Sequence, residues 1–270
     1  MEYKIAVQTD VGIKKETNQD SCCIKEAVTD KGTVLMAVIC DGMGGLAKGE
    51  VASATLIKTF SSWFETELPE ILATSKPLDE VEYRWDRIIK EQNQNIAAYG
   101  KNLKLQLGST ITAMLILEDN RYIIVHVGDS RAYKITDTNV KTLTEDQTVV
   151  AKEVRQGRLT PKQAEADPRR NVLLQCVGAS RIVEPEFYYG SVTSDECYML
   201  CSDGFRHVIT SEEILNAFAP SQNSTEEQMN AHIVELIELN KFRHENDNIT
   251  ALLIKTVKGG VSYGKCRTSY

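Results

Sequence analysis

Apolar and polar positions alternate along much of the chain, and two long stretches instead repeat apolar residues every third or fourth position. Short apolar runs between turn signals predict β-strands, here at residues 3–8, 21–27, 34–40, 109–117, 122–127, 131–135, 187–189, 196–201 and 249–257. The helical spacing predicts helices at 49–67, 79–99, 146–155, 161–165, 225–240 and from 211. Because the first and the last predicted elements are both strands, residues 1–257 are expected to form a single α+β domain.

Two segments depart from this pattern. Residues 145–178 are polar and do not alternate, which predicts an insertion that runs over the surface. Residues 258–270 form a short polar run that contains three glycines, and we expect them to be a flexible tail.

The predicted strand at 34–40 is followed at once by Asp41 and then by Gly42-Met43-Gly44-Gly45. A carboxylate at the end of a buried strand is costly unless a partner compensates its charge. Glycines let that partner approach the backbone and its carbonyl groups. A bound Mg²⁺ or Mn²⁺ would satisfy both features, although a turn with an aspartate cap is the simpler explanation of this stretch alone.

The same ending recurs elsewhere. Asp129 and Asp203 each follow a predicted strand, Asp247 precedes the last strand, and Asp20 precedes the second. In antiparallel sheets, strand ends and neighbouring strand starts share an edge, so five aspartates can converge there. Such carboxylates repel one another unless divalent cations lie between them. No His or Cys accompanies them at zinc spacing, so the set indicates Mg²⁺ or Mn²⁺.

Composition argues against nucleic-acid and membrane partners. The 270 residues carry a net charge of −7 and a pI of about 5.3, whereas both partners favour basic surfaces. We find no apolar stretch of the ~18 residues needed to span a bilayer and no signal peptide. Seven cysteines without a CxxC pair indicate reduced thiols, so we expect a cytoplasmic protein.

Eight segments in a fixed order give the chain a family resemblance. They are Asn18-Gln19-Asp20, Asp41-Gly42-Met43-Gly44-Gly45, Gly108-Ser109-Thr110, Gly128-Asp129-Ser130-Arg131-Ala132-Tyr133, Leu143-Thr144-Glu145-Asp146, Arg169-Arg170-Asn171-Val172-Leu173, Ser202-Asp203-Gly204 and Asp247-Asn248-Ile249-Thr250. In this set the chain resembles the metal-dependent serine/threonine protein phosphatases of type 2C (the PPM family), and especially their bacterial members.

The resemblance implies a four-layer α-β-β-α sandwich, in which two antiparallel sheets are flanked by helix pairs, with residues 145–178 as a flap. It also implies two Mn²⁺ or Mg²⁺ ions at one edge. Asp41 would bridge both ions, the Gly42 carbonyl would bind one, and Asp203 and Asp247 the other. Asp20 would hold metal-bound water.

The implied chemistry is hydrolysis without a phosphoenzyme. A water between two metals ~3.5–4 Å apart becomes hydroxide near neutral pH and attacks phosphorus in line, while cations neutralise the phosphoryl oxygens. Asp129, with Asp203, would form a weaker third metal site. The expected substrates are phosphoproteins made by a serine/threonine kinase, and the enzyme is expected to be a monomer.

Four positions depart from the family pattern. Lys15 stands where an arginine usually grips the substrate phosphate, and a lysine cannot make the bidentate contact. Gln19 replaces a glutamate, which predicts weaker binding of one ion. Met43 stands where many eukaryotic members have a histidine general acid, as is common in bacterial members. His207 replaces an aspartate that usually helps to hold the third metal.

These departures leave two other functions open. One is a pseudophosphatase, a binding or regulatory module that keeps the fold with a weakened metal site. The other is an enzyme that prefers small phosphate esters. Plainer interpretations of single residues are a partly exposed surface position for His207, a structural ion pair for Arg131, and core positions for Trp63 and Trp85.

Overall fold

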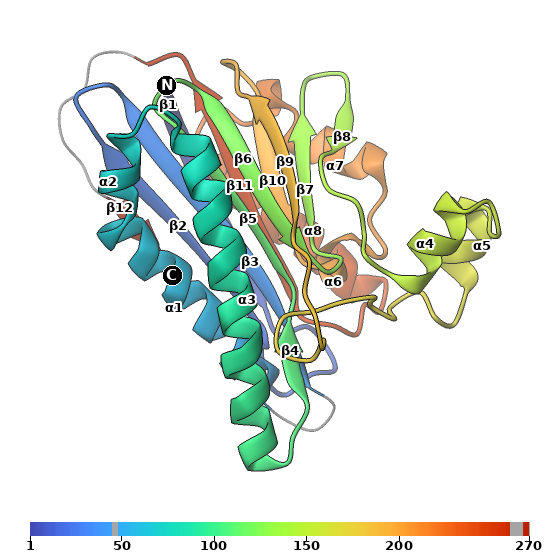
Figure 1. Cartoon of the computed structure of the whole chain (residues 1–270). Coiled ribbons are helices and arrows are strands. Elements are labelled where there is room, and N and C mark those ends of the chain that lie inside the picture. Colours follow the sequence, from blue (N-terminus) through green and yellow to red (C-terminus); the bar gives the residue numbers. More distant parts are fainter. Residues whose placement is uncertain (45–47, 260–266, 270) are drawn as a thin grey trace.

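Two antiparallel β-sheets lie face to face in the middle of the molecule, with helices on their outer faces (Figure 1). The computed structural model describes residues 1–44, 48–259 and 267–269. Within these residues, one sheet has the strand order β1 (Glu2–Asp10), β11 (Ile249–Val257), β10 (Cys197–Cys201), β7 (Arg131–Ile135) and β8 (Val140–Thr142). The other has the order β12 (Arg267–Ser269), β2 (Asp20–Val28), β3 (Thr33–Gly44), β5 (Ile111–Ile116), β6 (Arg121–Val127) and β9 (Glu186–Ser191), and β4 (Leu107–Ser109) pairs with β3.

Each sheet has its own helical cover. Helices α1 (Gly49–Thr66) and α3 (Pro77–Leu103) lie against the sheet that contains β3, and α7 (Ser211–Phe218) and α8 (Glu226–Phe242) lie against the other. The short helices are α2 (Leu68–Leu72), α4 (Val149–Arg155), α5 (Pro161–Ala166), α6 (Asp203–Arg206) and a 3₁₀ turn, η1 (Pro220–Gln222). This arrangement confirms the predicted four-layer sandwich. No helix among the described residues is long and apolar enough to cross a membrane.

The strand β3 is buried on both faces, which explains its uninterrupted apolar sequence. One face belongs to the core under α1 and α3, through Val34, Met36, Val38 and Cys40. The opposite face belongs to the core between the two sheets, through Leu35, Ala37 and Ile39. Burial on both sides fixes the register of β3, so the position of its end at Asp41 is fixed as well.

Most predicted elements occur within a few residues of their expected bounds, and the differences have local causes. The helix predicted from 146 begins at Val149, because the Thr148 side chain caps it by accepting a hydrogen bond from the Ala151 amide at 3.1 Å. The three-residue strands β4 and β8 and the five-residue helix α2 were not predicted, since elements this short carry no periodicity.

The segment predicted to be a tail contains a short strand. Residues 267–269 form β12, which pairs antiparallel with β2 in the register Arg267↔Glu26 to Ser269↔Ile24, so the prediction of a flexible segment is wrong there. The pairing covers the otherwise open edge of β2. Residues 260–266 and 270 lie outside the described residues. In Figure 1 the part of 145–178 that contains α4 and α5 projects from the side of the sandwich.

The helix pair over β3 depends on an aromatic cluster, as the sequence predicted for Trp63 and Trp85. Trp85 of α3 is fully buried, and its ring lies 5.3 Å from that of Phe60 and 5.4 Å from that of Trp63. Trp85→Ala should therefore lower the free energy of unfolding by about 3–5 kcal/mol, as for other large buried side chains. Chemical denaturation measures this loss. Tyr83→Ala, on the exposed side of the same helix, is the control and should change stability by less than about 0.5 kcal/mol. Equal losses in both variants would contradict the assignment.

Candidate metal centre

Five aspartates from five separate segments gather at one edge of the sandwich. Asp41 ends the apolar run of β3 and lies opposite Asp20, the first residue of β2. Asp203 is the first residue of α6, directly after β10, and Asp247 lies in the turn before β11, which pairs with β10. Asp129 lies in the turn between β6 and β7. The structure thus brings together all five aspartates that the strand pattern predicted at a common edge.

The carboxyl groups act strongly on one another. Burial, followed by the charges of Asp20, Asp203, Asp129 and Asp247, raises the pKa of Asp41 well above its usual value. Burial and the charges of Asp203 and Asp247 likewise raise the pKa of Asp20 to about 7, although the Thr250 and Ser202 hydroxyl groups lower it in part. Such a cluster stores electrostatic repulsion that a cation would relieve.

The oxygens without partners show where positive charge is missing. Both carboxylate oxygens of Asp20 and Oδ1 of Asp203 are buried and accept no hydrogen bond of normal geometry from the described residues. The Thr250 and Ser202 hydroxyl groups lie near enough to Asp20 to lower its pKa in part, but they carry no positive charge. Buried polar atoms of this kind are uncommon and call for a ligand. All-oxygen donors fit Mg²⁺ or Mn²⁺, so the residues fit the implied metals, although no three or more His, Cys, Asp or Glu side chains in the described part already surround a single point.

Asp247 is paired with a lysine. The Lys15 Nζ lies 2.8 Å from Asp247 Oδ1, and the same oxygen accepts a hydrogen bond from the Asn248 amide at 2.9 Å. Burial acts to lower the pKa of Lys15, but the hydrogen bond to Asp247 and the charges of Asp247, Asp41 and Asp203 raise it above its usual value. The ammonium group is therefore a counter-ion at the rim of the cluster.

The loop that carries Lys15 is held by Asn248, the residue directly before β11, which pairs with β1. The Asn248 side chain accepts from the Gln19 amide at 2.9 Å and donates to the carbonyls of Val11 at 2.9 Å and Thr17 at 3.2 Å. These three bonds fix both ends of the loop between β1 and β2. The sequence contained Asn248 in a family segment but gave it no role, because only the fold brings it to residues more than 200 positions away.

The backbone at Gly42 leaves no room for a side chain. A Cβ there would lie 2.3 Å from the Gly49 carbonyl oxygen and 2.6 Å from that of Gln19. The Gln19 side-chain amide, oriented to satisfy both neighbours, donates to the Gly42 carbonyl at 3.3 Å and accepts from the Gly49 amide at 3.2 Å. A carbonyl oxygen has two lone pairs, so one remains for the ion that the resemblance places at Gly42.

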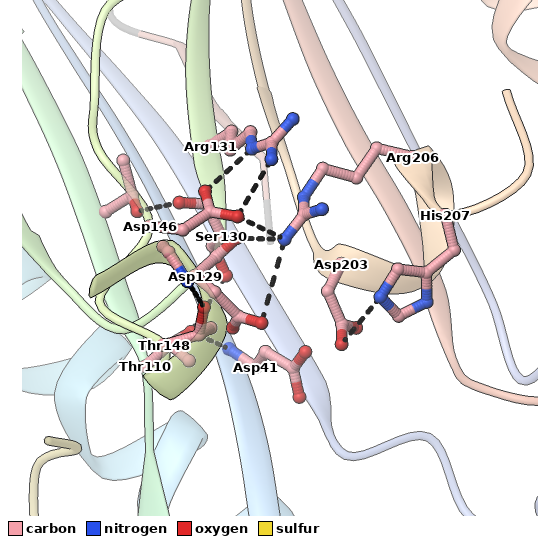
Figure 2. A network of polar contacts seen from close by, with 12 residues as sticks. Asp41, Thr110, Asp129, Ser130, Arg131, Asp146, Thr148, Asp203, Arg206 and His207 are labelled. Atoms are coloured by element: carbon pink, nitrogen blue, oxygen red, sulfur yellow. Dashed lines mark hydrogen bonds and ion pairs between the residues drawn. The ribbon is translucent and has the colours of Figure 1, made fainter. Parts of the chain in front are cut away.

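A second network borders the cluster on the side of Asp129 (Figure 2). Arg131 donates to both oxygens of Asp146, at 2.7 and 2.8 Å, which confirms the structural ion pair predicted for Arg131. Arg206 donates to Asp146 Oδ2 at 3.2 Å and to the Asp129 carbonyl at 2.9 Å. Burial and the charge of Asp203 nevertheless raise the pKa of Asp129 to about 7, with Arg206 acting in the opposite direction.

His207 ends the short helix α6 and lies between two carboxylates. Its side chain is 15% exposed and lies between Asp203 and Glu245, with Nε2 3.4 Å from Asp203 Oδ2 and Nδ1 3.3 Å from Glu245 Oε2. The histidine is thus partly exposed, as predicted, and two carboxylates from different segments lie against its ring. Neither Arg206 nor Glu245 was singled out by the sequence.

Known proteins resemble this chain over nearly its full length. The family model for Protein phosphatase 2C matches residues 11–238. Serine/threonine phosphatase stp of Listeria welshimeri is 30% identical over 251 residues, which cover 92% of this chain and 94% of that relative. Among solved structures, the S. agalactiae serine/threonine phosphatase has a TM-score of 0.82 at 28% identity, with 94% and 100% of the two chains covered. The catalytic domain of serine threonine protein phosphatase PstP, in complex with 2 manganese ions, has a TM-score of 0.75 at 28% identity, with 95% and 99% covered.

Metal addition should stabilise the protein because it removes the repulsion between the carboxylates. At about a hundred times its Kd, Mn²⁺ should raise the Tm by roughly 5–10 °C, as measured by scanning calorimetry. Asp203→Asn should abolish most of this rise without lowering the Tm of the metal-free protein, since it removes a like charge. Asp30→Asn, in an exposed turn, is the control and should keep the full rise. An undiminished rise in Asp203→Asn would exclude that residue as a ligand.

Proposed function

Because the chain belongs to the protein phosphatase 2C family, we propose that it removes phosphate from phosphoserine and phosphothreonine residues of proteins with the help of two divalent cations. The observation that carries this proposal is the cluster of five carboxyl groups, in which three buried oxygens of Asp20 and Asp203 have no partner among the described residues. Retention of Asp41, Asp203 and Asp247 also argues against the pseudophosphatase, since a module that only binds has no need of this repulsion.

In this proposal four of the five aspartates have a defined part. Asp41 would contact both ions, the Gly42 carbonyl one of them, and Asp203 and Asp247 the other, while Asp20 would accept hydrogen bonds from the surrounding water. Bound divalent cations supply a water acidic enough to attack phosphorus at neutral pH and neutralise charge on the phosphoryl group. Mn²⁺ and Mg²⁺ both suit the all-oxygen set.

Lys15 would bind the substrate phosphate. In the structure its ammonium pairs with Asp247. When that carboxylate binds a cation, its charge is no longer available to Lys15, and the ammonium can turn to an incoming phosphate. Its side chain is 39% exposed, so this movement costs little desolvation. An ammonium makes a weaker and less directional contact with phosphate than a guanidinium.

A groove next to the centre favours protein substrates over small phosphate esters. It has a volume of about 900 Å³ and reaches Met43, two residues beyond Asp41. Its walls come from the end of α3, from β4 and from residues 173–182. Among its lining residues, Lys104 and Arg181 are basic and none is acidic. A chain segment beside the phosphorylated residue would fit there, whereas a small ester has no use for it.

The cellular setting is inferred from the cysteines. The six cysteines in the described part of the chain are buried and unpaired, which supports a reducing compartment. We therefore infer that the protein acts in the cytoplasm, where it would reverse phosphorylation by a serine/threonine kinase.

Metal-dependent hydrolysis of a phosphopeptide tests the proposed function. We expect turnover of a phosphothreonine peptide and of an aryl phosphate with added Mn²⁺, less with Mg²⁺ because Gln19 replaces an acid, and none after exhaustive chelation. Restored turnover on renewed Mn²⁺ addition is the control for damage by the chelator. Turnover of the aryl phosphate alone would favour an enzyme for small esters, and no turnover of either substrate would favour the pseudophosphatase.

Substitutions at Lys15 test its contact with phosphate. Lys15→Ala should raise KM more than it lowers kcat, because a cation that binds substrate and transition state alike contributes uniform binding. The expected loss in kcat/KM corresponds to about 1–3 kcal/mol, the range of a charge-assisted hydrogen bond. Lys15→Arg should lower KM through a bidentate contact. Lys14→Ala, a neighbouring exposed lysine, is the control. Steady-state kinetics that are unchanged in Lys15→Ala would remove this role.

A further inference from the structure

Arg206 lies between the aspartate cluster and the base of segment 145–178 (Figure 2). Its Nη2 donates to the Asp129 carbonyl at 2.9 Å and to Asp146 Oδ2 at 3.2 Å, and it lies 3.6 Å from Asp129 Oδ2. The Arg206 side chain is 11% exposed and that of Asp129 is 6% exposed. With Arg131 on the other side of Asp146, two guanidinium groups face two carboxyl groups in a buried network.

The resemblance assigns Asp129 and Asp203 to a third metal ion, but in this chain nitrogen atoms of other side chains already lie beside both carboxyl groups. Asp129 lies against Arg206, and Asp203 Oδ2 lies against the His207 ring. In contrast, the buried carboxylate oxygens without partners in the described part of the chain are the two of Asp20 and Oδ1 of Asp203. A guanidinium thus lies beside the Asp129 carboxylate, with Arg206 Nη2 3.6 Å from Oδ2, whereas no ion pair to Asp20 is found among the described residues.

We infer that Arg206 is a fixed cation in the place of a third divalent ion, so that the centre of this chain holds two ions. The inference rests on the proposed function for the two-ion centre. A guanidinium stays charged at every accessible pH, and in a buried site its repulsion of a nearby divalent cation is poorly screened by salt. A third ion at Asp129 would have to displace Arg206. The displaced guanidinium would then pair with Asp146 alone, and Asp146 already pairs with Arg131.

A purely structural role is the competing explanation, because Arg206 also joins α6 to Asp146 at the base of segment 145–178. The two explanations differ in the number of ions bound. A structural anchor changes stability when it is removed but creates no metal site, whereas removal of a cation that excludes a metal ion opens a site at Asp129.

Counting bound Mn²⁺ separates the two explanations. The full chain would be titrated with Mn²⁺, with the free ion followed by electron paramagnetic resonance and the bound ion by calorimetry. The variants are Arg206→Gln, which keeps an N–H donor and removes the charge, Asp129→Asn, and the two combined. Arg121→Gln is the matched control, since it removes the same charge from an exposed position at the other end of β6.

We expect two ions in the natural chain, in Asp129→Asn and in Arg121→Gln. Arg206→Gln should bind a third ion at Mn²⁺ concentrations at least about tenfold below any at which the natural chain would take one up, and the combined variant should lose it. A third ion in the natural chain that disappears in Asp129→Asn would overturn the inference, as would only two ions in folded Arg206→Gln. If circular dichroism shows that Arg206→Gln is unfolded, the natural chain and Asp129→Asn alone decide. A natural chain that binds no Mn²⁺ would refute the proposed function and the inference with it.

Discussion

The mutual repulsion of buried carboxyl groups is the constraint on which the rest of this structure depends. Each of the five aspartates lies at or beside the end of a strand whose register is fixed by burial or pairing, so the carboxyl groups cannot relax by moving apart. Burial first, and then the charges of the neighbouring aspartates, raise the pKa values of Asp41 and Asp20 above their usual range. The rest of the fold has to be stable enough to tolerate an edge that is unfavourable without cations.

That stability comes from the same strand that delivers Asp41. Because β3 is buried on both faces, a one-residue slip would exchange its two apolar surfaces and change both cores at once. At its end the backbone of Asp41 is held from the neighbouring segment, where the Thr110 hydroxyl accepts from its amide at 3.0 Å and the Thr110 amide donates to its carbonyl at 2.9 Å. Packing and hydrogen bonding thus hold the Asp41 carboxylate in a buried position beside other carboxyl groups. Its charge is unfavourable there without a cation, and it is correctly placed to bind one.

The sequence could predict this edge because its signals are local. A buried apolar run that ends in Asp-Gly can be recognised without knowing its neighbours, as at Asp41 and Asp203. The features that it could not predict depend on pairing across long separations. Arg206 meets residues 60 and 77 positions away, β12 pairs with a strand at the other end of the chain, and Lys15 meets Asp247 across the whole sequence. No periodicity or turn signal records such contacts.

Lys15 and Arg206, which make two of these long-range contacts, neutralise the charge of the cluster in different ways. Lys15 is a half-exposed point charge on a flexible stem, so it can leave Asp247 when a metal ion or a phosphate competes for it. Arg206 is buried and bonded to two partners through a planar group, so its charge is a permanent part of the edge. The exchangeable cation Lys15 lies beside Asp247, and the fixed cation Arg206 lies beside Asp129 and Asp146. The placement of these two side chains therefore determines which part of an acidic edge is open to metal ions and substrate.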